Sequence, residues 1–537
     1  MNHENLYLRQ NIQVEPLIDH WYAWPHLIPP ATTARNITER HMKIMTSYIN
    51  SPQVHVNAVK NPKMQGGPFI DLGGRVDEVR ALRDRTKAER PHLFELSAAI
   101  GELDNMIRTN AKGYSLQPLY AKVPDILRGY VELLYDLNHQ PSFRLVEPLL
   151  YKSRYYDPSM QSLMLSVIQQ DDRPFVLSTP RFEDDSSLHL QIPFNSPVVD
   201  ELFRLKSSPR PQEEIEEMFD LKEGQRELLR SFLTPEPAPH YASYQGAGVR
   251  WRYFGHACIL IESQGVSMLF DPVLSYTYES GISRYTYLDL PDSIDYVLIT
   301  HHHQDHVLFE TLLQIRHKVK TIVVPRCGGG QLQDPSLKLL LEQAGFANVI
   351  EATEMEEIKT GNVRITALPF FGEHADLDIR SKMAWLVKIG AHAMIFAADS
   401  CNIEPRLYEH IHREVGDADA LFLGMECDGA PLTWLYGPLI TARTERAMDE
   451  SRRLSGSNFE QGRSIVEVFN CKEVYVYAMG QEPWLNYITS IKYTAESRPI
   501  VESDKLVKWS LERGIIAERL FGEKEILIEQ APLVAAG

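Results

Sequence analysis

The sequence has few cysteines and no long apolar run. Its five cysteines are spread from Cys258 to Cys471, and no two of them stand in a C-x-x-C pair. An odd number of scattered cysteines argues against a disulfide framework and fits a reducing compartment, so we expect a cytoplasmic protein. There is no uncharged apolar stretch of about 18 residues. The first residues also lack a basic segment followed by an apolar one, so we expect neither a membrane span nor a signal peptide.

Basic residues are scarce relative to acidic ones. Lys and Arg number 55 and Asp and Glu 72, which gives a net charge of -17. Because phosphates attract Lys and Arg, we expect neither nucleic acid nor an anionic membrane as a general partner, although a local basic patch is not excluded. Apolar residues make up 44% and charged residues 24% of the 537 residues. This balance is typical of a globular protein, and the length suggests about two to four domains.

The N-terminal half carries no Gly-rich phosphate loop and no cluster of metal ligands, and we interpret His41 and His55 as structural. The spacing of apolar residues predicts helices at 35–48, 77–110 and 198–232. Short segments richer in alternation predict strands at 162–167, 174–177 and 187–193. We therefore predict a mixed α+β domain over residues 1–235.

The connector from Leu233 to Arg250 marks the clearest boundary. It contains Pro235, Pro237 and Pro239 and then two glycines, and these residues interrupt helices and strands. We predict a second domain over residues 246–537. Strands are expected there at 251–262, 265–271, 296–300, 321–325, 363–369, 383–389, 393–397, 420–425 and 473–477. Helices are expected at 308–317, 337–344, 404–415, 458–470 and 503–513. Strands that alternate with helices indicate a layered α/β domain.

The segment LITHHHQDHV, from Leu298 to Val307, predicts a metal site. Where a chain leaves a strand, alternate residues point the same way, so His301 and His303 can chelate one ion. Asp305 and His306 then turn toward a second ion. A merely polar His-rich turn would explain neither the preceding strand nor the aspartate. The loop indicates a metallo-β-lactamase-type αββα sandwich that holds two metal ions, and this is the fold class we predict for the C-terminal half.

The remaining ligands must come from the ends of later strands. Asp399 closes the apolar strand AMIFAAD and suits a ligand shared by both ions. A carboxylate in such a place is costly unless it is paired or bound to metal. Glu373 follows VRITALP, with His374 as its rival. Glu426 follows ALFLGM, with Asp428 as its rival. Spacing favours the two glutamates, and both alternatives stay open.

No histidine follows His412, so the last 125 residues cannot supply a histidine ligand. The predicted site then holds three histidines and four carboxylates. An oxygen-rich set of this kind matches iron or manganese better than zinc, which shifts the expected reaction from hydrolysis toward dioxygen activation. Manganese and mixed-metal hydrolases also use carboxylates. A dinuclear zinc or manganese hydrolase with a metal-bridging hydroxide therefore remains the alternative.

At this point the chain resembles the di-iron β-hydroxylases of nonribosomal peptide biosynthesis, typified by the enzyme of chloramphenicol assembly. The resemblance spans nearly the whole length. In the C-terminal half it rests on FGHACILIE, FDPVL, THHHQDH, FFGEHADL, AADS and LGMECDGAP. In the N-terminal half it rests on WYAWP at 21–25, NSPQVH at 50–55 and GGPF at 66–69.

The resemblance implies two iron ions, dioxygen as co-substrate and an external electron donor. The iron ligands it implies are His301, His303, Asp305, His306, Glu373, Asp399 and Glu426. Glu373 and Asp399 are the residues we expect to matter most directly for catalysis. Asp271, in FDPVL, is expected to support a metal-bound histidine, because such histidines usually donate their other N–H to a carboxylate.

The resemblance also implies the reaction. An amino acid, expected to be aromatic, is held as a thioester on a nonribosomal peptide synthetase carrier domain and hydroxylated at its β-carbon, in antibiotic biosynthesis. The N-terminal domain is expected to serve carrier docking and dimerisation, which makes the protein a homodimer. Carrier domains are commonly acidic, so docking onto a chain of charge -17 requires a local basic patch. A non-catalytic binding module would show degraded ligand positions, whereas every position here is filled.

Overall fold

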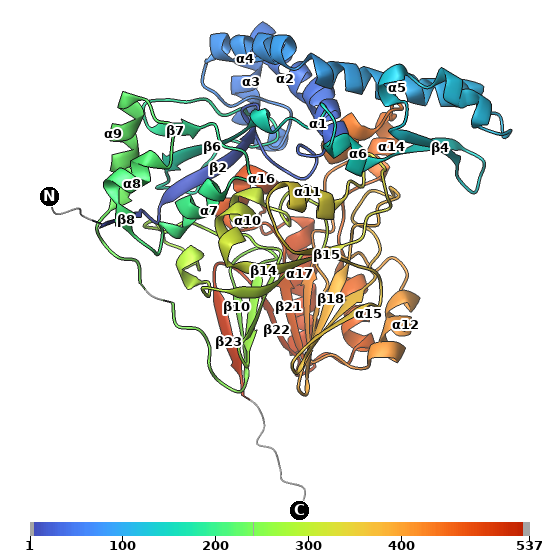
Figure 1. Ribbon diagram of the computed structural model, residues 1–537. Coiled ribbons are helices and arrows are strands. Elements are labelled where there is room, and N and C mark those ends of the chain that lie inside the picture. The colour runs from blue at the N-terminus through green and yellow to red at the C-terminus, as the bar shows by residue number, and fades with distance from the viewer. Residues whose placement is uncertain (1–4, 240, 530–537) are drawn as a thin grey trace, which may run out of the picture.

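The protein is described by a computed structural model that covers residues 5–239 and 241–529. In the C-terminal half, two seven-stranded sheets face each other and helices cover their outer faces. The N-terminal half lies over one edge of this sandwich, above it in Figure 1. The predicted αββα fold, preceded by a mixed α+β domain, is confirmed.

The first sheet is parallel on one side and antiparallel on the other. Its last strand along the chain, β23, pairs with its first, β10. Helices α10 (Phe309–Ile315) and α11 (Leu337–Gln343) pack on the outer face. The strand order is β15 (Val349–Ala352), β14 (Val319–Pro325), β13 (Ile294–Leu298), β12 (Val266–Phe270), β11 (Ile259–Ser263), β10 (Val249–Tyr253) and β23 (Lys524–Ile528).

The second sheet repeats this plan, with parallel pairing from β19 to β22. Its outer face is covered by α12 (Arg406–Val415), α15 (Phe459–Val468) and α17 (Arg498–Leu511). The strand order is β16 (Glu357–Thr360), β17 (Val363–Leu368), β18 (Ala384–Ile389), β19 (His392–Phe396), β20 (Ala420–Gly424), β21 (Glu473–Tyr477) and β22 (Ile516–Arg519).

Aromatic side chains fill the space between the two sheets. Phe270 of the first sheet stacks on Phe396 of the second, with ring centroids 4.1 Å apart, and Phe396 stacks on Phe422 at 4.7 Å. Trp251 packs edge-on against Phe422. Burying one such side chain stabilises a fold by about 1.5–3 kcal/mol, so this layer holds the sheets together.

The N-terminal half contains a four-stranded sheet in the order β3 (Trp21–Tyr22), β2 (Ile12–Ile18), β6 (Gln161–Val167) and β7 (Ser187–Leu190). Its core is continuous with the outer layer of the first C-terminal sheet, since Trp21 and Leu165 belong to the same apolar cluster as Leu313 and Leu340. The helices are α1 (Pro30–Asn36), a π-helical turn η1 (Ile37–His41), α2 (Met42–Asn50), α3 (Pro52–Val59), α4 (Val76–Glu89), α5 (Pro91–Asn110), α6 (Glu147–Tyr151), α7 (Pro197–Arg204), α8 (Gln212–Glu217) and α9 (Glu223–Ser231).

Three expectations for the N-terminal half need correction. The helix predicted at 77–110 is two helices, because Pro91 has no N–H to continue the first and begins the second. The helix predicted at 198–232 is three short ones. The strand predicted at 174–177 is wrong: Val176 donates its N–H to the carbonyl of Tyr487 in the C-terminal half and joins no sheet.

The strand predicted at 251–262 is also wrong, because the chain reverses in its middle. Strands β10 and β11 are antiparallel partners joined by the turn from Phe254 to Cys258. Gly255 and His256 take φ values of 108° and 51°. This left-handed backbone allows the tight reversal, and it places His256 at the edge of the sheet.

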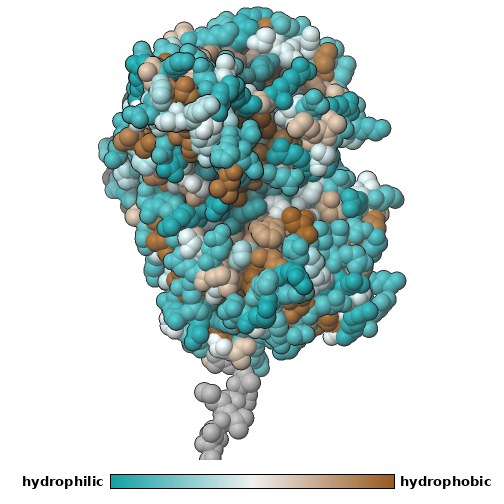
Figure 2. All heavy atoms as spheres, turned by 90° about the vertical axis from the view of Figure 1, so that its right-hand side faces the viewer, coloured by the Kyte–Doolittle hydropathy of each residue, from teal (hydrophilic) through white to brown (hydrophobic). Residues whose placement is uncertain are grey.

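The outer surface is mostly hydrophilic, as Figure 2 shows for one face of the molecule. Apolar residues on this face gather near mid-height, where the N-terminal half meets the sandwich. Over residues 5–239 and 241–529, every helix is too short or too polar to cross a membrane.

Candidate metal centre

The predicted ligands come from the ends of four strands, and Asp271, their predicted support, comes from the end of a fifth. The loop 301–306 follows β13, and the other acidic residues follow β12, β17, β19 and β20. Parallel strands end at the same edge of a sheet, which brings these residues together. The N-terminal half lies against this loop, since the ring of His26 is 4.8 Å from that of His302.

A first group contains His301, His306 and Asp399, all buried. The Oδ2 atom of Asp399 lies 2.9 Å from Nε2 of His306 and 3.7 Å from Nε2 of His301. The other ring nitrogen of His306, Nδ1, is 2.8 Å from Oδ2 of Asp271. Asp271 also accepts hydrogen bonds from the N–H and hydroxyl of Thr300. Asp271 therefore fixes the His306 ring so that Nε2 faces the cluster.

A second group contains His301, His303 and Glu373. The Nδ1 atom of His303 is 2.9 Å from Oε1 of Glu373. On the opposite side of its ring, Nε2 is 2.9 Å from the hydroxyl of Tyr436. Nδ1 of His374 is also 2.9 Å from this hydroxyl. The structure thus turns Glu373 into the cluster and His374 toward Tyr436.

A third group contains His256, Asp305 and His306, with Nε2 of His256 3.3 Å from Oδ2 of Asp305. His256 was missed by sequence reasoning because its segment was interpreted as the middle of a strand. Its Nδ1 accepts the N–H of Gly480 at 3.2 Å. In the neutral ring the proton then sits on Nε2, so His256 can donate a hydrogen bond to Asp305.

Glu426 and its rival Asp428 lie in different surroundings. Asp428 is exposed and 3.7 Å from Arg453. The pKa of Glu426 is raised well above its usual range by burial and by the nearby carboxylates of Glu373 and Asp399. Glu426 therefore lies beside the cluster, although it is not in any of the three groups of closely spaced ligand atoms.

His302 and Tyr436 complete the surroundings of the site. His302 points away from the cluster: its Nδ1 lies 2.7 Å from the hydroxyl of Ser381, which is itself hydrogen-bonded to Asp334. Tyr436 ends the short helix α13 (Leu432–Tyr436) and is buried. The sequence analysis did not predict a role for Tyr436. This residue lies on a helix far along the chain from the histidines, and no local motif contains it.

The electrostatics of the cluster favour added positive charge. Burial, together with Asp399 and Asp305, raises the pKa of Glu373 well above its usual range. Burial lowers the pKa of His303 to about 4, and it lowers that of His301 well below the usual value, with a further contribution from His306. Neutral histidines and crowded carboxylates are the forms that bind metal cations.

Unpartnered buried atoms give an independent test of whether the site fits metal ions. Neither Nε2 of His301 nor Oδ1 of Asp399 has a hydrogen-bond partner. A buried polar atom without a partner is costly, and a metal ion removes that cost. The mixture of imidazole and carboxylate donors suits iron. The residues present therefore fit a pair of iron ions.

Comparison with known proteins gives the family. Residues 7–237 match the diiron non-heme β-hydroxylase N-terminal domain, and residues 267–432 match the β-lactamase superfamily domain. The chain is 42% identical over 521 residues to the 4-amino-L-phenylalanyl-[CmlP-peptidyl-carrier-protein] 3-hydroxylase of Streptomyces venezuelae, which covers 96% of this chain and 98% of that one. The crystal structure of CmlA, a diiron β-hydroxylase from Streptomyces venezuelae, matches with a TM-score of 0.92 at 41% identity and covers 98% of this chain and all of that one.

These matches confirm the resemblance, the enzyme class and the two-iron cofactor, and they decide against the dinuclear hydrolase. They also agree with the predicted donor set, whose mixture of imidazole and carboxylate groups suits iron. The chain belongs to the non-haem di-iron β-hydroxylase family.

Proposed function

We propose that this enzyme hydroxylates the β-carbon of an aromatic amino acid held as a thioester on a carrier domain. The observation that carries the proposal is the 42% identity, over nearly the full length, to a 3-hydroxylase whose name specifies an aminophenylalanyl group on a peptidyl carrier protein. Similarity over both halves supports a shared way of receiving the substrate as well as a shared metal centre.

We propose as iron ligands the residues that meet at the strand ends. Two iron ions bound there would supply the activation of dioxygen that C–H hydroxylation needs. The three groups of closely spaced donor atoms and the raised pKa of Glu426 support this set. The proposed ligands are His301, His303, Asp305, His306, Glu373, Asp399 and Glu426.

The protein's own contribution is to hold these side chains still and to keep water away. Asp271 orients His306, and Tyr436 orients His303. Outer partners of this kind fix the tautomer of a ligand and tune its basicity. The loop is buried beneath the N-terminal half, and its histidines are at most 5% exposed. Exclusion of water protects reactive intermediates and strengthens electrostatic interactions inside the site.

The substrate is tested by comparing a carrier-bound aromatic amino acid with the same amino acid free in solution. We expect faster product formation from the carrier-bound form under single-turnover conditions, because binding energy from the carrier and its arm orients the β-carbon. Mass spectrometry of both products measures this. Equal rates would remove the carrier from the proposal.

The ligand set is tested with two matched pairs of variants. We expect Glu373→Ala and Glu426→Ala to lose iron and activity, because each removes a proposed carboxylate ligand. His374→Ala and Asp428→Ala should keep more of both, since these side chains face Tyr436 and Arg453. Iron per chain and product per chain are measured beside wild type. If His374→Ala empties the site while Glu373→Ala retains iron and activity, the assignment is wrong.

The homodimer and the docking role of the N-terminal domain, with boundaries at 1–235 and 246–537, remain predictions. Light scattering of the purified holoenzyme during size-exclusion chromatography tests the dimer directly. A mass equal to one chain would exclude it.

A further inference from the structure

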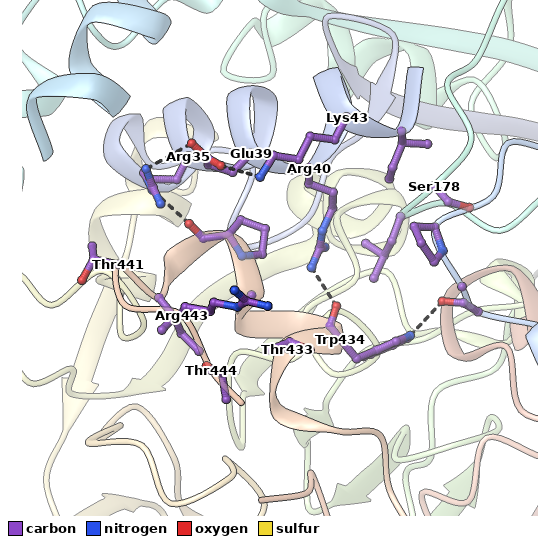
Figure 3. Close-up of a pocket in the computed structure, with 18 of the residues that line it drawn as sticks. Arg35, Glu39, Arg40, Lys43, Ser178, Thr433, Trp434, Thr441, Arg443 and Thr444 are labelled. Carbon is purple, nitrogen blue, oxygen red and sulfur yellow. Dashed lines mark hydrogen bonds and ion pairs between the residues drawn. The ribbon is translucent and has the colours of Figure 1, made fainter. Parts of the chain in front are cut away.

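A cavity of about 800 Å³ lies where the two halves of the molecule meet. One wall is formed by the helical segment from α1 to α2 and the other by α13 and the chain that follows it, up to Thr444 (Figure 3). Gly66 and Gly67 line it as well, and the indole N–H of Trp434 bonds to the carbonyl of Gly66 at 2.9 Å. This contact ties α13 to the loop that carries Gly66.

The cavity is basic in a chain that is strongly acidic. Four cationic side chains line it, and Glu39 is the single carboxylate among the lining residues. Glu39 is paired with Lys43 at 2.7 Å and with Arg35 at 3.6 Å. The remaining cations are Arg40 and Arg443, neither of which has an ion-pair partner in the described ranges 5–239 and 241–529. The lining therefore carries an excess of positive charge.

Arg40 is a largely buried cation that no carboxylate neutralises within the described ranges. Its Nη2 donates to the backbone carbonyls of Trp434 and Leu435 at 2.7 and 2.9 Å. Its buried Nη1 has no hydrogen-bond partner. Burial lowers the pKa of Arg40 to about 10, so the guanidinium stays charged at neutral pH. A partly buried cation without a counterion is stabilised by an anion bound beside it.

The other lining groups indicate what is attached to that anion. Thr441 offers a hydroxyl group, while the hydroxyls of Thr433 and Ser178 already donate to Asp449 and to the carbonyl of Phe69. Phe175 and Trp434 provide apolar surface, with ring centroids 6.1 Å apart. Figure 3 shows Arg40 reaching from one wall toward Trp434 and Arg443 reaching in from the other. A phosphate joined to a flexible chain of amide and methylene groups matches these charged, hydroxyl and apolar surfaces.

The position of the cavity relative to the metal centre fits such a ligand. Helix α13 contributes Thr433 and Trp434 to the cavity wall, and on the same helix Tyr436 bonds to His303 and His374. One short helix thus separates the cavity from the cluster. A helix is about 10 Å across, and an extended pantetheine arm is longer than that.

We propose that this cavity binds the phosphodiester of a carrier domain's phosphopantetheine arm, through Arg40, Lys43 and Arg443. This rests on the proposed function, because it presumes a carrier-bound substrate. It also supplies the local basic patch that docking of an acidic carrier requires. Phosphate oxygens accept charge-assisted hydrogen bonds from guanidinium and ammonium groups, which provides both affinity and placement.

The first test compares two small probes on the iron-loaded protein. 4′-Phosphopantetheine should bind more tightly than pantetheine, which lacks the phosphate. The double variant Lys43→Ala/Arg443→Ala should weaken phosphopantetheine binding by about tenfold or more, toward the value for pantetheine. Both side chains are exposed, so the variant should fold. Equal binding of the two probes to wild type would overturn the proposal, as would unchanged binding to the double variant.

Arg446→Ala is the matched control. Arg446 lies three positions beyond Arg443, outside the cavity, where it pairs with Glu450 and is 90% exposed. The Arg446→Ala variant should bind both probes as wild type does. If it weakens phosphopantetheine binding as much as the double variant, general surface charge is responsible and the site is refuted. The variant Arg40→Lys adds a second check, because it keeps the positive charge but loses the forked guanidinium. It should weaken the binding of phosphopantetheine and leave the binding of pantetheine unchanged.

The second test uses the full reaction. With a carrier-bound aromatic amino acid, the double variant should raise KM by about tenfold or more while iron per chain stays at the wild-type value. An unchanged KM would overturn the proposal. If wild type fails to hydroxylate the carrier-bound amino acid but still prefers phosphopantetheine over pantetheine, the proposed function fails and the phosphate site stands. The two failures are therefore distinguishable.

Discussion

Two of the clusters of buried charged side chains in the described part of the chain are built in opposite ways. At the metal centre, carboxylates such as Glu373 and Asp399 crowd one another, and buried atoms remain without partners. Where the two halves meet, Arg173 bonds to Glu15 at 2.7 Å and to Glu310 at 2.9 Å. The first cluster is incomplete without added cations, whereas the second contains its own.

The surroundings of the second cluster complete the contrast. Glu310 accepts hydrogen bonds from the hydroxyls of Tyr22, Tyr276 and Tyr487 at 2.8, 2.7 and 3.4 Å. Although burial opposes it, Arg181 and Arg173 lower the pKa of Glu15, the reverse of the shift at Glu373. At the metal centre the carboxylates raise the pKa of Glu373, as expected where cations bind, whereas arginine lowers the pKa of Glu15 in a structural contact.

Replacing a carboxylate of the incomplete cluster should have the largest effect. Asp399→Asn keeps the size of the side chain but removes the charge between His301 and His306. We expect iron per chain to fall sharply and hydroxylation to fall by about a thousandfold, since losing a ligand exceeds the 10–100-fold cost of losing an outer partner. Elemental analysis, product assays and circular dichroism are the measurements. Full iron content with normal activity would contradict the assignment of this cluster as the metal centre.

Replacing a carboxylate of the closed cluster should destabilise the fold instead. Glu310→Gln leaves Arg173 buried with only one carboxylate, and breaking a buried pair costs about 3–5 kcal/mol. Urea unfolding should show the loss, while folded protein keeps its iron. Tyr276→Phe removes one neutral donor to Glu310 and the acceptor of the Val14 N–H, and it is the milder control at about 2 kcal/mol. A normal unfolding midpoint combined with lost iron would reverse the roles we assign to the two clusters.

The smallest effect is expected at Tyr436, which touches the first cluster from outside. Tyr436→Phe removes the hydroxyl that holds His303 and His374. Iron affinity should fall by about 10–100-fold, with little change in the unfolding of the iron-free protein. Competition with a chelator measures the affinity. Wild-type affinity would show that packing alone orients His303.

Local signals in the sequence predicted the metal loop, because all its histidines lie within six consecutive positions after one strand. The strand ends carrying Asp399 and Glu426 were also local features. His256 was hidden by a reversal that Gly255 permits inside an otherwise strand-like segment. Tyr436 could not be assigned, because its contact with His303 depends on how distant segments pack.

Weak local signals and long-range packing together explain gaps in the predicted fold. Strands β22 and β23 were missed because they are short and largely half-exposed, so they lack the apolar signal of the inner strands. The paired cluster was not foreseen either, since Glu15, Arg173 and Glu310 are far apart in sequence. Propensity and spacing identify what neighbouring residues do, whereas long-range packing decides the rest.

The pairing of β10 with β23 has a consequence for synthesis. Strand β10 begins at Val249, and the strand that covers its free side ends at Ile528. While the ribosome translates the sequence between them, one backbone edge of β10 stays uncovered. An open edge can pair with other chains. Nascent chains that stop early should therefore aggregate, whereas completed ones close that edge themselves.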